Sequence, residues 1–446
     1  MTRFAPSGPL RGELRPPPDK SISHRAALIG AMCDDTVEVE GYLESADTES
    51  TLEAVRRLGA GVDSSPAGRP GAFDLKVTGI GLQGPGERAG DGAGRIDVGN
   101  AGTLLRLLPG WLAGQGRGQW TLDGDESIRR RPVDRVAEPL LQMGADVECR
   151  DGRLPPLDVS GRALRGISYR LPVASAQVKS CVLLAGLLAD GETQITEPAP
   201  TRDHTERMLA ACGAGVTSEP LRTLPTVGGG PVCRVTVRPA EHLHGDQILV
   251  PGDFSSAAFL IVAATIVKGS RVRVEGVGLN ETRVGLLGIL NRMGAPIEVE
   301  ERPEAVEPVG AIAARHGSLE ATRVHAEEVP LAIDELPLVA LLGCFAEGRT
   351  VVSGAEELRH KESDRIATVV EGLGGIGADI EATEDGFAVN GTGELAGGRL
   401  DAHRDHRLAM LGAIAGLASR EGVEVAGMEA AGVSYPGFED DLRALL

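Results

Sequence analysis

The sequence predicts an α/β (α+β) protein of two domains, each built from three copies of one module. With 446 residues, the chain is about three times as long as an ordinary domain. Apolar residues make up 42% of it, which is enough for a large core. One pattern also recurs six times: a polar cluster, an Ala/Gly/Leu-rich helix, a Gly-containing turn and a short β-branched strand.

The six copies of this pattern begin 71 to 81 residues apart, close to one sixth of the chain. Six modules of about 75 residues each are too many to share one hydrophobic core. We therefore predict two domains of three modules. The copies are DKSISHRAALIGAMCDDTVEVEG from Asp19, NAGTLLRLLPGWLAGQGRGQWTLDG from Asn100, SAQVKSCVLLAGLLADGETQITE from Ser175, DFSSAAFLIVAATIVKGSRVRVEG from Asp253, DELPLVALLGCFAEGRTVVSG from Asp334 and DHRLAMLGAIAGLASREGVEVAG from Asp405.

A second helix recurs out of phase with the first and ends at a Gly-Ala pair before another strand. Glycine just past a helix end is the usual left-handed cap. The predicted helix ends lie within 54–63, 139–148, 207–217, 289–299 and 372–381, and the sixth copy is the terminal DLRALL.

The expected crossovers between the domains lie near HLHGDQILVPGD and near PPPDK. The N-terminal domain is therefore predicted over 21–246. The C-terminal domain is predicted over 1–20 together with 247–446.

Composition excludes several classes of protein. A formal net charge of -19 does not suit a nucleic-acid binder, which needs a basic face. No apolar run approaches the roughly 18 residues of a membrane span. The first 20 residues contain no apolar signal region, and the six cysteines form no CxxC pair. We therefore expect a cytoplasmic protein with reduced thiols.

The starts of the repeated helices carry hydrogen-bonding and charged groups. Helix capping alone explains the Ser, Asp and Asn residues. It does not explain cations in a first turn, where the helix dipole disfavours them unless an anion is bound. Lysine is informative here, because only five of the 45 basic residues are lysines. The groups are Lys20/Ser21/Ser23/Arg25, Asn100/Thr103/Arg106, Ser175/Gln177/Lys179, Asp253/Ser255/Ser256, Asp334/Glu335 and Asp405/His406/Arg407.

Two loops add further charge. Residues 125–132 contain three successive arginines, of which Arg129 and Arg130 are expected to be solvated. Residues 357–365 place Lys361 and Arg365 four residues apart, on one face of a predicted helix, beside Glu362. Such a cleft suits phosphates and carboxylates with general acid–base chemistry. The cluster of His403, Asp405 and His406 lacks zinc-site spacing, and no nucleotide-binding loop is present.

Eight ordered motifs resemble the enolpyruvyl transferases, and among them the second sequence class of the branch that uses shikimate 3-phosphate. The motifs are DKSISHRA, GNAGTLLR, RRRP, ASAQVKS, TRDHTERM, IDELPL, LRHKESDRI and DHRLAM. The resemblance covers essentially the whole chain. It implies an inside-out α/β barrel in each of two domains, with three βαβαββ repeats around a pseudo-threefold axis and the active site in the interdomain cleft.

The resemblance also implies a reaction, which joins phosphoenolpyruvate to the 5-hydroxyl of shikimate 3-phosphate by addition and elimination and releases phosphate. It implies small-molecule substrates, neither a metal nor an organic cofactor, no nucleic-acid or membrane partner, and a monomer. The implied catalytic residues are Asp334, Glu362, Lys20 and Lys361. Those implied to bind shikimate 3-phosphate are Lys20, Ser21, Arg25, Ser175, Ala176, Gln177, Arg202, Asp334 and Lys361. Those implied to bind phosphoenolpyruvate are Lys20, Gly102, Arg131, Gln177, Arg365 and Arg407.

One departure and two alternatives accompany the resemblance. Many relatives carry a lysine shortly before the final [ST]-[FY]-P, where this chain has Val433 before Ser434. The first alternative is the sister enzyme that transfers enolpyruvyl to a UDP-N-acetylamino sugar. It typically uses a loop cysteine, and residues 123–130 contain none. The second alternative, a non-catalytic anion-binding relative, would predict loss of Asp334 or Glu362.

Overall fold

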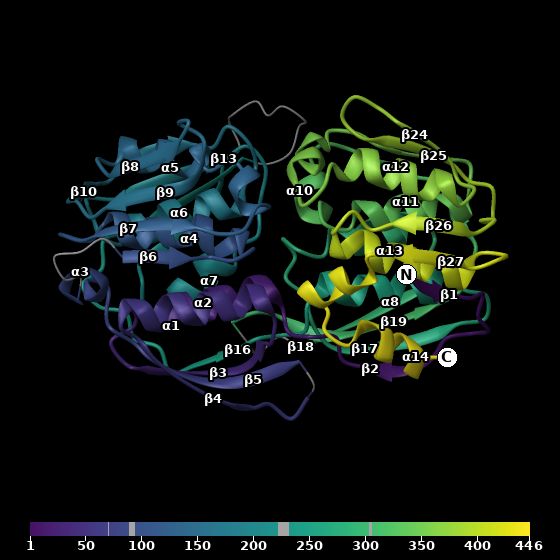
Figure 1. Ribbon diagram of the computed structural model, residues 1–446, viewed down its shortest axis with the longest axis horizontal. Helices are drawn as coiled ribbons and strands as arrows, with labels where there is room; N and C mark the ends of the chain where they lie inside the picture. Colours follow the sequence, from purple (N-terminus) through teal and green to yellow (C-terminus); the bar gives the residue numbers. More distant parts are fainter. Residues whose placement is uncertain (70, 89–93, 222–231, 303–305) are drawn as a thin grey trace. The chain divides into compact units, whose positions relative to one another are not determined.

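The structure is a computed structural model that describes residues 1–446 except 70, 89–93, 222–231 and 303–305 (Figure 1). Contacts within the chain divide it into two units. The N-terminal unit is Pro18–Val250, and the C-terminal unit combines Met1–Pro17 with Pro251–Leu446. Lys20, predicted in the C-terminal domain, therefore lies in the N-terminal unit.

Three four-stranded sheets of one design form the N-terminal unit. Their strands are β3 (Thr36–Leu43), β4 (Gly61–Pro66), β5 (Ala72–Thr78), β6 (Gly94–Asp97), β7 (Gln119–Asp123), β8 (Asp146–Arg150), β9 (Leu154–Ser160), β11 (Ser168–Arg170), β13 (Thr193–Glu197), β14 (Val216–Leu221), β15 (Val232–Val237) and β16 (Gln247–Leu249). The strand orders are β16-β3-β5-β4, β6-β7-β9-β8 and β11-β13-β15-β14. In each sheet the first pair is parallel and the next two pairs are antiparallel.

The C-terminal unit repeats this design. Its sheet strands are β1 (Thr2–Phe4), β2 (Arg11–Leu14), β17 (Arg271–Gly278), β18 (Ile297–Arg302), β19 (Val309–Arg315), β21 (Arg323–Val324), β23 (Arg349–Val352), β24 (Asp379–Ala382), β25 (Phe387–Asn390), β26 (Gly398–Asp401) and β27 (Val423–Ala426). They form the sheets β2-β17-β19-β18, β21-β23-β25-β24 and β26-β27-β1. Figure 1 shows purple β1 and β2 among the green and yellow strands of this unit, because β1 pairs with β27 and β2 with β17.

The six repeated helices predicted from the sequence are present, and they are almost completely buried. They are α1 (Lys20–Met32), α4 (Gly102–Ala113), α6 (Ala176–Gly186), α8 (Phe254–Ile266), α11 (Leu336–Phe345) and α13 (His406–Ala418). Every residue of α8 is buried, as is every residue of α13 except Ala418. A helix that is apolar on all sides belongs in a core, which explains why these helices carry so few charges beyond their first turns.

Small residues bring the buried helices close together. A Cβ at Gly110 of α4 would lie 2.1 Å from the carbonyl oxygen of Cys181 in α6. Only glycine permits this approach, because any side chain would overlap the neighbouring backbone. With 61 glycines and 3% aromatic residues, the chain packs its core by close backbone approach more than by large rings.

The second set of helices ends where the Gly-Ala pairs predicted. These helices are α2 (Ala46–Leu58), α5 (Asp134–Gln142), α7 (His204–Ala211), α9 (Gly285–Arg292), α12 (Arg365–Gly375) and the terminal α14 (Phe438–Ala444). The glycine after each of the first five has a positive φ, between 76° and 107°, as a left-handed cap requires. The glycines are Gly59, Gly144, Gly213, Gly294 and Gly377.

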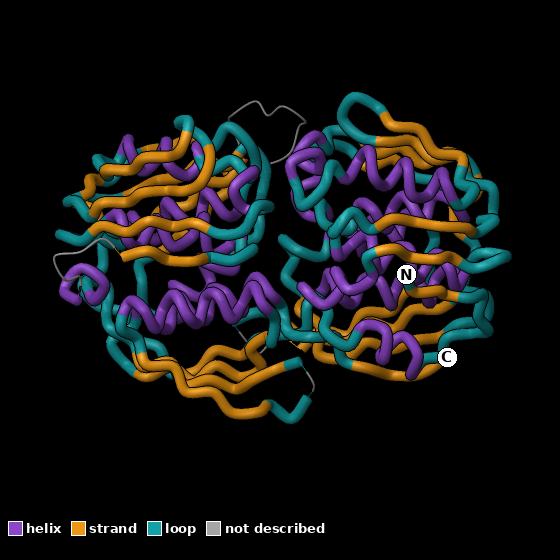
Figure 2. Tube along the Cα trace, in the orientation of Figure 1, coloured by secondary structure: helices purple, strands orange, loops and turns teal. Residues whose placement is uncertain are grey.

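Short elements complete the units, and Figure 2 shows how helices and strands alternate along them. They are α3 (Gly84–Arg88), α10 (Val329–Ala332), the strand pairs β10 (Leu164–Arg165) with β12 (Ala189–Asp190) and β20 (Leu319–Glu320) with β22 (Ala346–Glu347), and the 3₁₀ turns η1 (Ile128–Arg130), η2 (Glu356–His360) and η3 (Met428–Val433). Among the described residues, no helix has the length and apolar character needed to cross a membrane.

Candidate active site

The start of α1 places Lys20 and Arg25 in different environments. The Asp19 side chain caps α1 by accepting a hydrogen bond from the backbone N–H of Ile22. Lys20 is partly exposed, and its Nζ lies 3.2 Å from Oδ2 of Asp47. Asp47 therefore offsets the cation in the first turn, and Lys20 keeps one side open to solvent.

Arg25 ties together three helices of the N-terminal unit. Its Nε donates to Thr205 Oγ1 of α7 at 2.7 Å, and its Nη2 donates to Ser180 Oγ of α6 at 3.0 Å. Its Nη1 donates to the carbonyl oxygen of Ser21 at 3.0 Å. The guanidinium is thereby held rigidly beside the first turns of α1 and α6, where Ser21, Ser175 and Ala176 lie.

A second group gathers at the start of α4. Gly102 has no side chain, and a Cβ there would lie 2.9 Å from Nη1 of Arg131 and 3.1 Å from Nη1 of Arg106. Arg131 in turn donates to Asn100 Oδ1 at 3.1 Å. The absence of a side chain at Gly102 thus allows two guanidinium groups to approach a helix N-terminus.

Gln177 joins this group from α6. Its Oε1 accepts from Nη1 of Arg106 at 3.2 Å, and its Nε2 donates to Thr103 Oγ1 at 3.3 Å. Arg106 is buried and also donates to the carbonyl oxygen of Gly102. Arg106 therefore links the glycine and the glutamine that the resemblance singled out.

The remaining predicted residues of this unit lie at two helix starts. The Ser175 side chain caps α6 by accepting from the backbone N–H of Val178, and Ala176 is the first residue of the helix. Arg202 is half-buried and directly precedes Asp203, the N-cap of α7.

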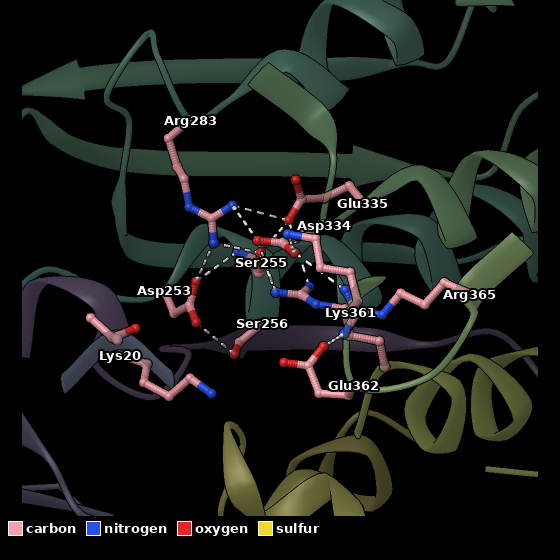
Figure 3. A network of polar contacts seen from close by, with 12 residues as sticks. Lys20, Asp253, Ser255, Ser256, Arg283, Asp334, Glu335, Lys361, Glu362 and Arg365 are labelled. Carbon is pink, nitrogen blue, oxygen red and sulfur yellow. Dashed lines mark hydrogen bonds and ion pairs between the residues drawn. The ribbon is translucent and has the colours of Figure 1, made fainter. Parts of the chain in front are cut away.

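In the C-terminal unit, Arg365 is the centre of a dense ionic network (Figure 3). Its side chain is 1% exposed. Its Nη2 lies 2.6 Å from Oε2 of Glu362, and its Nε lies 2.8 Å from Oδ2 of Asp405. Its Nη1 lies 3.3 Å from Oδ1 of Asp334. One buried guanidinium therefore holds both carboxylates predicted to move protons.

Asp334 is surrounded by cations. Besides Arg365, Lys361 approaches it with an Nζ–Oδ1 distance of 3.8 Å, and Arg407 with an Nη2–Oδ2 distance of 3.6 Å. The side chains of Asp334, Lys361 and Glu362 keep 13%, 28% and 26% exposure, so a bound molecule could reach them. The structure thus brings together all five residues predicted in this unit: Asp334, Lys361, Glu362, Arg365 and Arg407.

Comparison with known proteins shows the family of the chain. The family described as EPSP synthase (3-phosphoshikimate 1-carboxyvinyltransferase) matches residues 4–442. The chain belongs to this family. A 3-phosphoshikimate 1-carboxyvinyltransferase of Synechococcus sp. strain WH7803 is 46% identical over 440 residues, or 98% of this chain and 96% of the relative.

Solved structures agree with the assignment to the EPSP synthase family. An EPSP synthase from Acinetobacter baumannii superposes with a TM-score of 0.84 at 39% identity, covering 99% of this chain and 97% of the other. The enolpyruvyl transferase NikO from Streptomyces tendae shares the fold, with a TM-score of 0.73 at 18% identity over 99% of this chain and 96% of its own. The chain therefore has the mixed helix and strand, two-domain fold of this family.

One predicted feature of the site is wrong in its geometry. Lys361 and Arg365 do not share a helical face, because Lys361 is extended after η2 and α12 begins only at Arg365. The cause is Asp364, whose side chain caps α12 by accepting from the backbone N–H of Ala367. Lys361 and Arg365 meet instead at Asp334.

Lys179 also differs from its expected role in an anion site. It is 1% exposed, and its Nζ lies 2.7 Å from Oε1 of Glu206 and 3.1 Å from Oε2 of Glu197. Burial alone would lower the pKa of Lys179, but Glu206 and Glu197 raise it above its ordinary value. Lys179 Nζ donates to the carbonyl oxygen of Thr201 as well. Lys179 therefore belongs to a buried ion cluster beneath the loop that carries Arg202.

Arg365 and Asp405 are both charged. Burial alone would lower the pKa of Arg365, but the carboxylates of Asp405 and Glu362 raise it above its ordinary value. Burial would raise the pKa of Asp405, but Arg365 outweighs that effect and the pKa is lowered. The two pKa shifts both favour the charged forms, so Arg365 and Asp405 form a buried ion pair at the centre of the network.

Sequence reasoning missed the importance of several network members. The sequence patterns do not single out Arg283, and they mark Asp253, Ser255 and Glu335 only as groups at helix starts. Asp405 is marked as such a group and as a member of the rejected metal cluster. Arg283 is 4% exposed and lies within 3.3 Å of both Asp253 and Glu335. Arg283 lies two residues before α9 and directly follows the polar residues Glu281 and Thr282, so its local sequence does not mark it as buried.

Proposed function

We propose that this chain transfers the enolpyruvyl group of phosphoenolpyruvate to the 5-hydroxyl of shikimate 3-phosphate. The products are 5-enolpyruvylshikimate 3-phosphate and phosphate, in the shikimate pathway that leads to chorismate and aromatic amino acids. The observation that carries the proposal is the pair of carboxylates, Asp334 and Glu362, held by the buried guanidinium of Arg365. Membership of the EPSP synthase family supports the choice of substrates.

The two carboxylates suit the two proton transfers of an addition–elimination reaction. Asp334 takes the proton of the attacking hydroxyl, and Lys361 lies against the same carboxylate to stabilise the developing charge. Glu362 protonates the methylene carbon of phosphoenolpyruvate, which gives a tetrahedral ketal. The loss of phosphate and of a proton from the new methyl group then restores the double bond. Arg365 and Arg407 bind the anionic groups of phosphoenolpyruvate.

The N-terminal unit supplies the other predicted ligands. Lys20, Ser21, Arg25, Ser175, Ala176, Gln177 and Arg202 bind shikimate 3-phosphate in this proposal. Gly102, Arg131, Gln177 and Lys20 contact phosphoenolpyruvate. Hydrogen bonds among Arg25, Ser180 and Thr205, and among Arg106, Gln177 and Thr103, support these groupings within the unit.

We further propose that each unit consists of three βαβαββ repeats around a pseudo-threefold axis, with the buried helices inside. Five sheets of identical strand arrangement, and a sixth that shares their parallel pair, support this design. Six free cysteines fit a reducing compartment, so we place the protein in the cytoplasm. We also propose that it acts as a monomer.

A phosphate-release assay with alternative acceptors tests the proposal. With phosphoenolpyruvate present, we expect rapid phosphate release on addition of shikimate 3-phosphate and no increase with UDP-N-acetylglucosamine. Release that depends on the UDP-sugar would favour the sister enzyme. No release with either acceptor would favour a non-catalytic relative.

Thiol alkylation separates the proposal from the sister-enzyme alternative. Burial raises the pKa of Cys149 to about 11 and that of Cys181 to about 12, which keeps both thiols protonated near neutral pH. A hydrogen bond with Cys33 lowers the pKa of Cys212, but Cys212 is buried, which shields it from the reagent. Because the thiolate is the reactive form, iodoacetamide should leave most of the activity intact. Rapid loss of activity that phosphoenolpyruvate prevents would point to a cysteine in the site.

A further inference from the structure

The hydroxyl of Ser255 joins two arginines and a carboxylate inside the C-terminal unit (Figure 3). Ser255 is the second residue of α8 and is 2% exposed. Its Oγ accepts from Nη2 of Arg283 at 2.5 Å and from Nη2 of Arg407 at 3.1 Å, and it donates to Oε1 of Glu335. A hydroxyl has one hydrogen and two lone pairs, so these three bonds use its full capacity.

Glu335 offsets the positive charges of Arg283 and Arg407, which both donate hydrogen bonds to the Ser255 hydroxyl. The carboxylate is 0% exposed, and its Oε1 lies 3.3 Å from Nη1 of Arg283 and 3.7 Å from Nη1 of Arg407. A second carboxylate, that of Asp253, also pairs with Arg283, and its Oδ1 lies 3.3 Å from Nη2 of the arginine. A buried charge is tolerated only when it is paired in this way. The two arginines and the two carboxylates therefore form one buried group with no net charge.

Arg407 depends on Ser255 more than on its other neighbours. Its remaining contacts with Asp334 and Glu335 are ion pairs of 3.6 and 3.7 Å, longer than hydrogen bonds. Among the described residues, its Nε is buried without a hydrogen-bond partner. Ser255 thus fixes one edge of the guanidinium, and the Nε remains available as a donor.

We infer that Ser255 is a positioning residue, which orients Arg407 for the anion of phosphoenolpyruvate by locking it against Arg283 and Glu335. The inference rests on the proposed function, in which Arg407 binds that substrate. A planar guanidinium recognises a carboxylate or phosphate through two parallel N–H groups, so its orientation matters as much as its charge. Ser255 supplies orientation without adding charge.

The neighbouring serine provides a matched control. Ser256 lies on the same helix turn and is 1% exposed. Its Oγ donates to Oδ2 of Asp253 at 3.4 Å. Ser255→Ala and Ser256→Ala therefore each remove one hydroxyl from a buried site. Only Ser255→Ala removes a hydrogen bond to Arg407.

Steady-state kinetics on these two variants tests the inference. We expect Ser255→Ala to raise KM for phosphoenolpyruvate about tenfold, the usual scale of one hydrogen bond to a charged group. KM for shikimate 3-phosphate should stay near its wild-type value, although the melting temperature should fall because three buried charged groups lose a hydrogen-bond partner. Ser256→Ala should change each kinetic parameter less than twofold. Equal effects of the two variants, or equal rises in both KM values, would overturn the inference.

A second measurement keeps the inference separate from the proposed function. A crystal structure of Ser255→Ala should show the Arg407 guanidinium displaced or in several positions, whereas Ser256→Ala should leave it in place. An unmoved Arg407 would overturn the inference even if the enzyme proves active. A wild-type protein without activity would overturn the proposed function and leave the structural result to decide the positioning role.

A double-mutant cycle gives an independent check of the route through Arg407. In an Arg407→Lys background, Ser255→Ala should add little to the increase in KM for phosphoenolpyruvate, because its target has already been removed. Fully additive effects would show that Ser255 acts by some other route.

Discussion

Replacing Asp334 by Asn, or Glu362 by Gln, should lower kcat by about 100-fold or more, with much smaller changes in either KM. Both substitutions keep the size and most hydrogen bonding of the side chain but remove the group that carries the proton. Arg365 holds the two carboxylates at 3.3 and 2.6 Å, so each is already in a defined position before substrate binds. Steady-state kinetics with both substrates measures the effect.

A nearby carboxylate serves as the control for these variants. Glu356 lies at the start of η2, is exposed, and directly precedes the charged segment 357–365 that contains Glu362. Glu356→Gln should leave kcat unchanged. If Asp334→Asn or Glu362→Gln behaves like this control, that residue has no part in proton transfer.

Replacing Lys20 or Lys361 by Arg should lower kcat/KM by about 100-fold or more, equivalent to about 2.7 kcal/mol of transition-state stabilisation. Both substitutions retain the positive charge, so a loss of kcat/KM would report that the site requires the shape of an ammonium group. An ammonium is a compact charge that can lie against a hydroxyl or between two anions, whereas a guanidinium is a planar fork. Lys20 and Lys361 are 21% and 28% exposed, and their Nζ atoms lie 3.2 Å from Asp47 Oδ2 and 3.8 Å from Asp334 Oδ1.

Two other lysines provide the comparison. Lys76 is exposed and pairs with Glu38 on a neighbouring strand, and Lys268 is exposed beyond the end of α8. Lys76→Arg and Lys268→Arg should be nearly silent in kcat/KM and in melting temperature. Full activity of Lys20→Arg and Lys361→Arg would mean that the site requires positive charge alone.

The repeated elements were predictable because each has a local physical cause. Gly59 and Gly377 end helices by adopting positive φ, and the wholly apolar run of α8 can be stable only in a core. The family motifs predict five residues that the structure brings together in the C-terminal unit, Asp334, Lys361, Glu362, Arg365 and Arg407. These features depend on residues close together in the sequence.

Two of the features that escaped prediction depend on residues far apart in the sequence, and one depends on a local helix cap. Lys179 is buried because Glu197 and Glu206 lie around it, and neither partner is part of its motif. Arg283 joins Glu335 from 52 residues away. The start of α12 at Arg365 was misjudged because the Asp364 cap competes with continuation of the helix from η2. Distant partners therefore determine the environments of Lys179 and Arg283, whereas a local cap determines where α12 begins.

The most direct test of the account is a ³¹P NMR time course with purified protein and equimolar shikimate 3-phosphate and phosphoenolpyruvate. The phosphoenolpyruvate signal should decline as inorganic phosphate appears in equal amount, while the ester phosphate of shikimate 3-phosphate shifts to a new signal and persists. Phosphate release at the same rate without shikimate 3-phosphate, or unchanged signals of both substrates, would contradict enolpyruvyl transfer as the function of this chain.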